Sequence, residues 1–218
     1  MVLTSGKFRI PLLYEDDYLL VVVKPYNLLV QGDQSQAVSL YDILKEYRKN
    51  SFLGIVQRLD KVVYGLMVLA KNSKTAAKLS NLIKTGKIKK TYHAIVEGEM
   101  AESATLEHYI LKSHKKAIVF SQPKENAKKA ILSYSLLESF GSKSLIEIQL
   151  KTGRYNQIRA QLAYIKRPIV QDYKYQKLPQ SMTAIALIAK KLNFLHPFTG
   201  KNLIFDIPYP PNWKNFIR

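Results

Sequence analysis

The charged residues that could carry out chemistry gather in one short segment. Arg58, Asp60 and Lys61 stand together in QRLDK, directly before the apolar run VVYGLMVLA. A carboxylate flanked by cations can serve as a nucleophile, because it can add covalently to a substrate and depart again. A charged surface turn would have the same composition, so this segment alone leaves both interpretations open.

Two further segments carry cations and an aromatic ring. KTGRYNQIRAQLA places Arg154 in a turn after an expected strand, and Arg159 next to an apolar position of an expected helix. Either arginine could simply pair with a surface carboxylate. KKTYHAIVEG places Tyr92 at the entrance of a strand, where a core tyrosine is the usual occupant. Considered alone, each segment has a structural explanation.

The excess of basic residues indicates a polyanionic partner. Lysine and arginine outnumber aspartate and glutamate by 34 to 16, which gives a formal charge of +18. Such an excess is typical of nucleic-acid-binding proteins, although a generally lysine-rich surface would look the same. Seven lysines and no acidic residue occur between Lys71 and Lys90. We expect this segment to present a positive edge to phosphates, with a solvated face as the alternative.

The composition also bears on cofactors and location. The chain has no cysteine, which excludes disulfides, thiol catalysis and thiolate-bound metals. Its four histidines lack the spacing of a helical zinc site, so we expect neither a metal nor a cofactor. No run of 18 or more residues lacks a charge, and the first residues do not read as a signal peptide. We expect a soluble protein of the cytoplasm.

Apolar periodicity predicts the elements that hold these segments. Residues 12–23 end in a buried strand, which Lys24 and Pro25 stop. Ser39 and Asp42 form a capping-box pattern. They begin a helix whose apolar face is Leu40, Ile43, Leu44 and Tyr47. The run 62–70 is expected to be a strand, followed by a helix that Ser73 caps and that Gly86 stops. Ala76, Leu79 and Ile83 share the face of that second helix.

The second half of the chain reads as strands and one helix. We expect strands at 91–97, 117–120, 131–137 and 145–151, a helix at 156–166, and strands from TAIALIA to LNFLHPFTGKNLIFDIP around a Thr-Gly turn. The fold class is therefore α+β, a long mixed, mainly antiparallel sheet with helices packed on it. We expect one catalytic domain over residues 1–218.

Taken together and in order, the segments resemble the RluA family of RNA pseudouridine synthases. The family's opening pattern is matched by LLYEDDYLLVVVKPYNLLV, and its Arg-Leu-Asp signature by QRLDKVVYGLMVLAK. KKTYHAIVEG, KTGRYNQIRAQLAYIKRPIVQD and LIAKKLNFLHPFTGKNLIFDIPYP match the later motifs. The resemblance covers roughly residues 9 to 212, and such an ordered set is far more specific than one motif.

The resemblance implies a role for each site residue. Asp60 falls on the catalytic aspartate, Tyr92 on the tyrosine that stacks on the base, and Arg159 on the arginine that pairs with the aspartate. Arg58 would fill or flank the space that the flipped base leaves, and Leu187 would close the pocket over the uracil. The remaining motif positions, with roles in loop ordering and phosphate contact, are Lys61, Arg154 and Gln157. RNA is the implied partner, and we expect a monomer that needs neither metal nor membrane. The resemblance also implies a central active-site cleft, and we expect no separate N-terminal RNA-binding module of the kind that many relatives carry.

Some positions depart from the family pattern. Gln57 and Asn156 stand where histidines are common, Ile188 replaces another histidine, and Val63 and Tyr64 replace Thr-Ser. These changes put rate and substrate choice in doubt more than reaction type. The alternative hypothesis is therefore an RNA-binding or ribosome-assembly factor that keeps the fold and has lost the chemistry. Retention of Asp60 argues against it.

Overall fold

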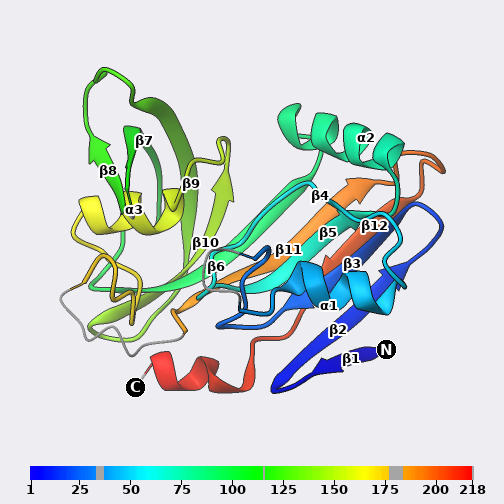
Figure 1. Ribbon diagram of the computed structural model, residues 1–218. Coiled ribbons are helices and arrows are strands. Elements are labelled where there is room, and N and C mark those ends of the chain that lie inside the picture. Colours follow the sequence, from blue (N-terminus) through cyan, green and yellow to red (C-terminus); the bar gives the residue numbers. More distant parts are fainter. Residues whose placement is uncertain (33–36, 115, 177–183, 218) are drawn as a thin grey trace. The chain divides into compact units, whose positions relative to one another are not determined.

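The computed structural model describes residues 1–32, 37–114, 116–176 and 184–217 (Figure 1). The chain forms two compact units. Unit 1 contains Met1–Lys89 and Ala189–Ile207, and unit 2 contains Lys90–Ile188 and Pro208–Arg218. Segments distant in sequence therefore build each unit.

The strands of unit 1 follow the order β1-β2-β3-β5-β11, with β12 beside β11 and β4 beside β5 (Figure 1). Their bounds are β1 Val2–Ser5, β2 Phe8–Glu15, β3 Leu19–Lys24, β4 Gly54–Ile55, β5 Tyr64–Ala70, β11 Leu187–Leu195 and β12 Asn202–Asp206. The pairs β1–β2, β2–β3, β3–β5, β4–β5 and β11–β12 are antiparallel. Every residue of β3 is buried, as its continuous apolar run predicts.

Helix α1 (Leu40–Tyr47) covers part of the core of unit 1. The predicted capping box is present, because Ser39 accepts from the Asp42 N–H and Asp42 accepts from the Ser39 N–H. Leu40, Ile43 and Leu44 pack in one cluster with side chains of β2, β3 and β5. Tyr47, expected on this face, is instead 37% exposed, and its hydroxyl donates to Glu15 Oε2 at 2.9 Å. Its polar end reaches a carboxylate partner outside the core.

Helix α2 (Ser73–Lys84) begins one residue earlier than the sequence predicts. Its N-cap is Asn72, because Asn72 Oδ1 accepts from the Thr75 N–H at 2.8 Å; the prediction of Ser73 was wrong. An amide oxygen can cap a helix as well as a hydroxyl does, so both residues fitted the pattern. Gly86 follows the helix in the left-handed conformation, with φ +69°, as its expected role as a stop requires.

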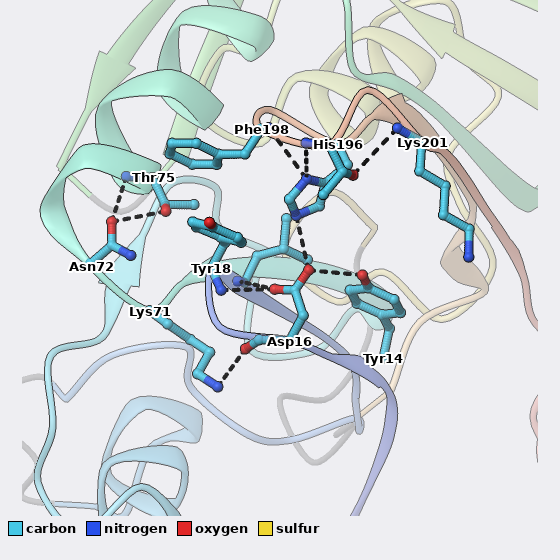
Figure 2. A network of polar contacts seen from close by, with 11 residues as sticks. Tyr14, Asp16, Tyr18, Lys71, Asn72, Thr75, His196, Phe198 and Lys201 are labelled. Carbon is cyan, nitrogen blue, oxygen red and sulfur yellow. Dashed lines mark hydrogen bonds and ion pairs between the residues drawn. The ribbon is translucent and has the colours of Figure 1, made fainter.

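A polar network joins the turn between β2 and β3 to the turn between β11 and β12 (Figure 2). His196 Nδ1 accepts from two backbone N–H groups of its own turn, and His196 Nε2 lies 2.9 Å from Asp16 Oδ2. The Phe198 ring stacks on Tyr18 at 4.3 Å, and Lys78 Nζ lies 4.3 Å from the same ring. These contacts fix α2, and the lysines it carries, to the strands of unit 1.

Unit 2 has the strand order β6-β10-β9-β7-β8, and its pairs are antiparallel. Their bounds are β6 Lys89–Glu97, β7 Ser103–Ser113, β8 Lys116–Phe120, β9 Lys128–Ser139 and β10 Lys143–Leu150. Helix α3 (Gln157–Tyr164) contacts β7 and β8, and a 3-10 helix η1 (Pro211–Phe216) follows β12. The sequence did not predict β1, β2, β4, β7 or η1.

The α+β fold class, with mainly antiparallel strands and a few packed helices, is confirmed. Within the residues that the structure describes, no helix is long and apolar enough to cross a membrane. Thr183, the first residue of the expected TAIALIA strand, lies outside the described residues.

Candidate active site

Asp60 lies in the loop that leads from β4 into β5. Its neighbours Arg58 and Lys61 have exposed side chains, whereas Asp60 is half-buried. The loop closes in a turn in which the Asp60 carbonyl oxygen accepts from the Val63 N–H at 3.0 Å. The three charged residues of the QRLDK segment therefore share one loop, and its carboxylate is partly shielded from solvent.

Lys24, at the end of β3, is a buried cation beneath this loop. Its side chain has 0% exposure. Lys24 Nζ donates to the carbonyl oxygens of Pro25 and Leu28, each at 2.8 Å, and of Lys61 at 3.2 Å. One ammonium group thus connects the turn after β3 to the residue that follows Asp60.

Two opposing effects act on the pKa of Lys24. Burial lowers the pKa of Lys24 to about 7, while the negative charge of Asp60 raises it. Lys24 and Asp60 therefore interact electrostatically. The sequence predicted only that Lys24 and Pro25 stop a strand. The position of Lys24, directly after a fully apolar run, is the pattern that could have indicated its burial.

Gly65 allows a close approach of two strands shortly after Asp60. Its φ is +134°, and a Cβ at this position would lie 2.5 Å from the Ala189 carbonyl oxygen. Any other residue would push β5 and β11 apart. The glycine of the QRLDKVVYG segment therefore fixes the base of the loop that carries Asp60.

Val63 and Tyr64, which depart from the family pattern, pack beside the loop. Val63 is buried, and the Tyr64 ring lies 5.3 Å from that of Tyr26. Burial raises the pKa of both tyrosines, so their hydroxyls stay protonated. Among the described residues, the buried amide nitrogen of Gln57 has no hydrogen-bond partner. Val63 and Tyr64 therefore fill the space next to the loop without adding a charge.

Tyr92 lies in β6 of unit 2, and its side chain is 7% exposed. Further along the same strand, the Ile95 N–H donates to the Ala186 carbonyl at 3.0 Å, and the Val170 N–H donates to the Ile95 carbonyl at 2.9 Å. Leu187, which is buried, follows directly. Two of the predicted site residues of unit 2 are thus attached to one strand.

Gln157 orders the turn of the KTGR segment. Its Oε1 accepts from Thr152 Oγ1 at 2.8 Å and from the Arg154 N–H at 2.9 Å, and its Nε2 donates to the Ile131 carbonyl at 3.1 Å. The Arg154 side chain is exposed, and its Nε donates to the Lys129 carbonyl at 2.8 Å. The glutamine is buried and the arginine is on the surface, so only the arginine could contact a phosphate from here.

Arg159 is a buried cation, and the surface pairing that the sequence left open does not describe it. Its guanidinium is 3% exposed and bonds both oxygens of Asp172, which has 0% exposure. The Nε–Oδ2 and Nη2–Oδ1 distances are both 2.7 Å. Asp172 could not be predicted as a site residue, because a lone aspartate in a loop after Pro168 belongs to no apolar periodicity.

The eight predicted site residues fall in two groups. Unit 1 contains Arg58, Asp60 and Lys61, and unit 2 contains Tyr92, Arg154, Gln157, Arg159 and Leu187. Among the described residues, no group of three or more histidine, aspartate or glutamate side chains is arranged to hold a metal ion. Unit 1 thus offers a carboxylate beside a buried cation, and unit 2 offers an aromatic ring and an oriented guanidinium. A carboxylate suits nucleophilic chemistry, and an aromatic ring suits stacking on a flat base.

Comparison with known sequences points to one family. The model of the family described as RNA pseudouridylate synthase matches residues 18–164. The ribosomal large subunit pseudouridine synthase D of Blochmanniella floridana is 34% identical, over 96% of this chain and 73% of the relative. The tRNA pseudouridine synthase C of Vibrio parahaemolyticus is 28% identical, over 96% and 94% respectively.

Comparison with solved structures agrees. The human protein RNA Pseudouridylate Synthase Domain Containing 4 superposes with a TM-score of 0.78 at 26% identity, over 94% of this chain and 91% of the human chain. The human protein RNA Pseudouridylate Synthase Domain Containing 1 gives a TM-score of 0.76 at 21% identity, which shows the shared fold.

Proposed function

The chain belongs to the RluA family of RNA pseudouridine synthases, and we propose that Asp60 is the nucleophile with which it isomerises uridine to pseudouridine. The observation that carries this proposal is the setting of Asp60. It is a half-buried carboxylate on a loop tied to the buried cation of Lys24.

The reaction needs little besides such a carboxylate. The bond from uracil N1 to the anomeric carbon of the ribose breaks, the base rotates, and uracil C5 bonds to the same carbon. C5 loses its hydrogen to solvent and N1 gains a proton, so the product is an isomer. Asp60 could attack C6 of the base, attack the anomeric carbon, or remove the 2′ proton of the sugar. All three routes begin from an ionised Asp60.

The other site residues would bind and orient the nucleotide. A uridine within a stacked helix is out of reach and must be extruded, at a cost of roughly a few kcal/mol. Tyr92 would stack on the uracil, a contact typically worth ~1–3 kcal/mol. Arg159 would keep Asp60 ionised and Leu187 would close over the base, as the resemblance implies. The proposed RNA contacts are Arg58, Lys61 and Arg154, with Gln157 ordering the loop.

We propose ribosomal or transfer RNA of the cytoplasm as the substrate class. Relatives named for each of these RNAs match nearly the whole chain. The formal charge of +18 supports a polyanionic partner. We further propose that both units act together as one catalytic domain and that a single copy of the chain is sufficient for activity.

The proposal is tested by following the hydrogen that the reaction releases. The purified protein is incubated with transcripts of ribosomal and transfer RNA that contain uridine tritiated at C5. Tritium should pass into water, and carbodiimide-dependent reverse-transcription stops should map to the modified position. Tight RNA binding without tritium release from every transcript would overturn the proposal in favour of a binding or ribosome-assembly factor.

A further inference from the structure

We propose that Asp172 is a positioning residue of the active site, which acts by fixing the guanidinium of Arg159. This inference rests on the proposed function, because Arg159 matters only if the chain carries out the isomerisation. Its observational basis is independent of that function and lies entirely within unit 2.

The geometry of the pair leaves Arg159 little freedom. Nε and Nη2 of Arg159 donate to separate oxygens of Asp172, both at 2.7 Å. Two parallel bonds to one carboxylate set the plane of the guanidinium as well as its position. The remaining donors of the planar fork then point away from Asp172. A single-point contact, such as lysine would make, could not set this direction.

Burial explains why the partner must be a carboxylate. Both side chains are almost wholly removed from solvent, so water does not stabilise the arginine charge. A buried cation needs an anion and hydrogen bonds nearby, and removing one partner leaves the other uncompensated. Asp172 therefore both neutralises Arg159 and aims it.

An aromatic residue holds the guanidinium from another direction. The Tyr175 ring centroid lies 5.5 Å from the guanidinium carbon of Arg159. The Tyr175 hydroxyl oxygen accepts from the Ala117 N–H at 3.0 Å and from Asn156 Nδ2 at 3.3 Å. Asn156, which departs from the family's usual histidine, thus supports the ring that packs on Arg159.

The turn that carries Asp172 is itself rigidly attached. The Asp172 carbonyl accepts from the backbone N–H groups of Tyr175 and Gln176 at 3.0 and 2.8 Å. Two residues before Asp172, Val170 bonds to Ile95 of β6. Because β6 also carries Tyr92, one hydrogen-bonded framework sets both the stacking ring and the guanidinium.

A double-mutant cycle on the rate of tritium release tests the inference. Enzyme in excess over RNA gives a single-turnover rate constant that does not depend on the folded fraction of the enzyme. Asp172→Asn keeps the shape of the side chain and removes its charge, and we expect a rate constant at least about tenfold lower. RNA affinity should stay within about twofold of wild type, because the pair is buried away from solvent and its effect falls on the chemical step.

The second arm shows whether Asp172 acts through Arg159. Arg159→Lys should also slow the reaction, and the double variant should be no slower than Arg159→Lys within about twofold. Effects that multiply, or an Asp172→Asn rate within about twofold of wild type, would overturn the inference. Asp172→Glu, which restores the charge, should recover part of the rate.

Two controls complete the test. Asp206→Asn removes a half-exposed carboxylate that pairs with Lys190, and the rate should be unchanged. Thermal melts identify the variants that are folded at the assay temperature. If Asp172→Asn is unfolded there, Asp172→Glu takes its place in the cycle, with a rate at least about threefold lower expected. No tritium release by wild type would overturn the proposed function, and this inference with it.

Discussion

At Asp60 the protein places a carboxylate between solvent and core. Asp60 is half-buried, and Lys24 holds its loop in place by donating to the carbonyl oxygen of Lys61. The chemistry proposed for Asp60 therefore depends on Lys24, a residue that does not need to touch the substrate.

Lys24 should make stability depend on pH. Its pKa is about 7 in the folded chain and near its ordinary 10.5 when unfolded, so above pH 7 the unfolded chain binds the extra proton. The free energy of unfolding of wild type relative to Lys24→Met should then be constant below pH 7. Above it, this difference should rise by up to about 1.4 kcal/mol per pH unit. Urea titrations of both proteins between pH 6 and 9 measure this difference. If the free energy of unfolding changes with pH equally in the two proteins, the lowered pKa of Lys24 is contradicted.

Tyr92 should contribute through both its ring and its hydroxyl. Tyr92→Phe keeps the stacking face, so RNA affinity should stay near wild type while the rate falls. Tyr92→Ala removes the face and should weaken binding of the extruded base by ~1–3 kcal/mol. Tyr134→Phe, at an equally buried tyrosine of β9, is the control and should change neither quantity. Filter binding and tritium release separate the two effects.

Among the elements, the contact of β5 with β11 fixes the base of the Asp60 loop. Gly65→Ala would place a methyl group 2.5 Å from the Ala189 carbonyl oxygen at a φ of +134°. We expect a loss of ~3 kcal/mol in the free energy of unfolding from strain and overpacking. Gly32→Ala, where a Cβ would meet nothing within 4 Å, should change stability by less than about 0.5 kcal/mol. Equal denaturation midpoints for the two variants would refute this account of Gly65.

Most helices and strands could be predicted, because the spacing of their apolar residues indicates which positions are buried. The apolar run of β3 and the capping box of α1 are local patterns, and the structure confirms both. Strand β7 was missed because polar residues occupy much of SATLEHYILKS and weaken its alternation. The cap of α2 was misplaced by one residue because Asn72 and Ser73 can both cap a helix.

Sequence motifs identified the site residues, but the sequence could not predict which groups surround them. The burial of Lys24 depends on the loop that closes over it, and that of Arg159 on Asp172, thirteen residues away. Both charges look like surface residues in sequence, because lysine and arginine usually are. Only tertiary packing turns them into buried cations, so a sequence pattern cannot distinguish the two cases.

For the whole molecule, the positive charge should govern RNA affinity. The lysines in and after α2 are mainly exposed, and the logarithm of the binding constant should fall linearly with the logarithm of salt concentration. The variant Lys84→Ala with Lys87→Ala should reduce that slope by up to about 1.4 if both lysines contact single-stranded phosphates. The matched variant Lys7→Ala with Lys49→Ala removes the same charge elsewhere in unit 1 and should leave the slope unchanged. Identical slopes for the two variants would show that Lys84 and Lys87 do not contact RNA phosphates.

The central claim is that one carboxylate, that of Asp60, carries out the isomerisation. The most direct test compares tritium release and RNA affinity for Asp60→Ala and wild type, with RNA saturating in both. We predict no release above background for the variant and an affinity within about threefold of wild type, because only the chemical step needs the carboxylate. Release by the variant within about tenfold of the wild-type rate would contradict the claim, as would a loss of affinity as large as the loss of rate.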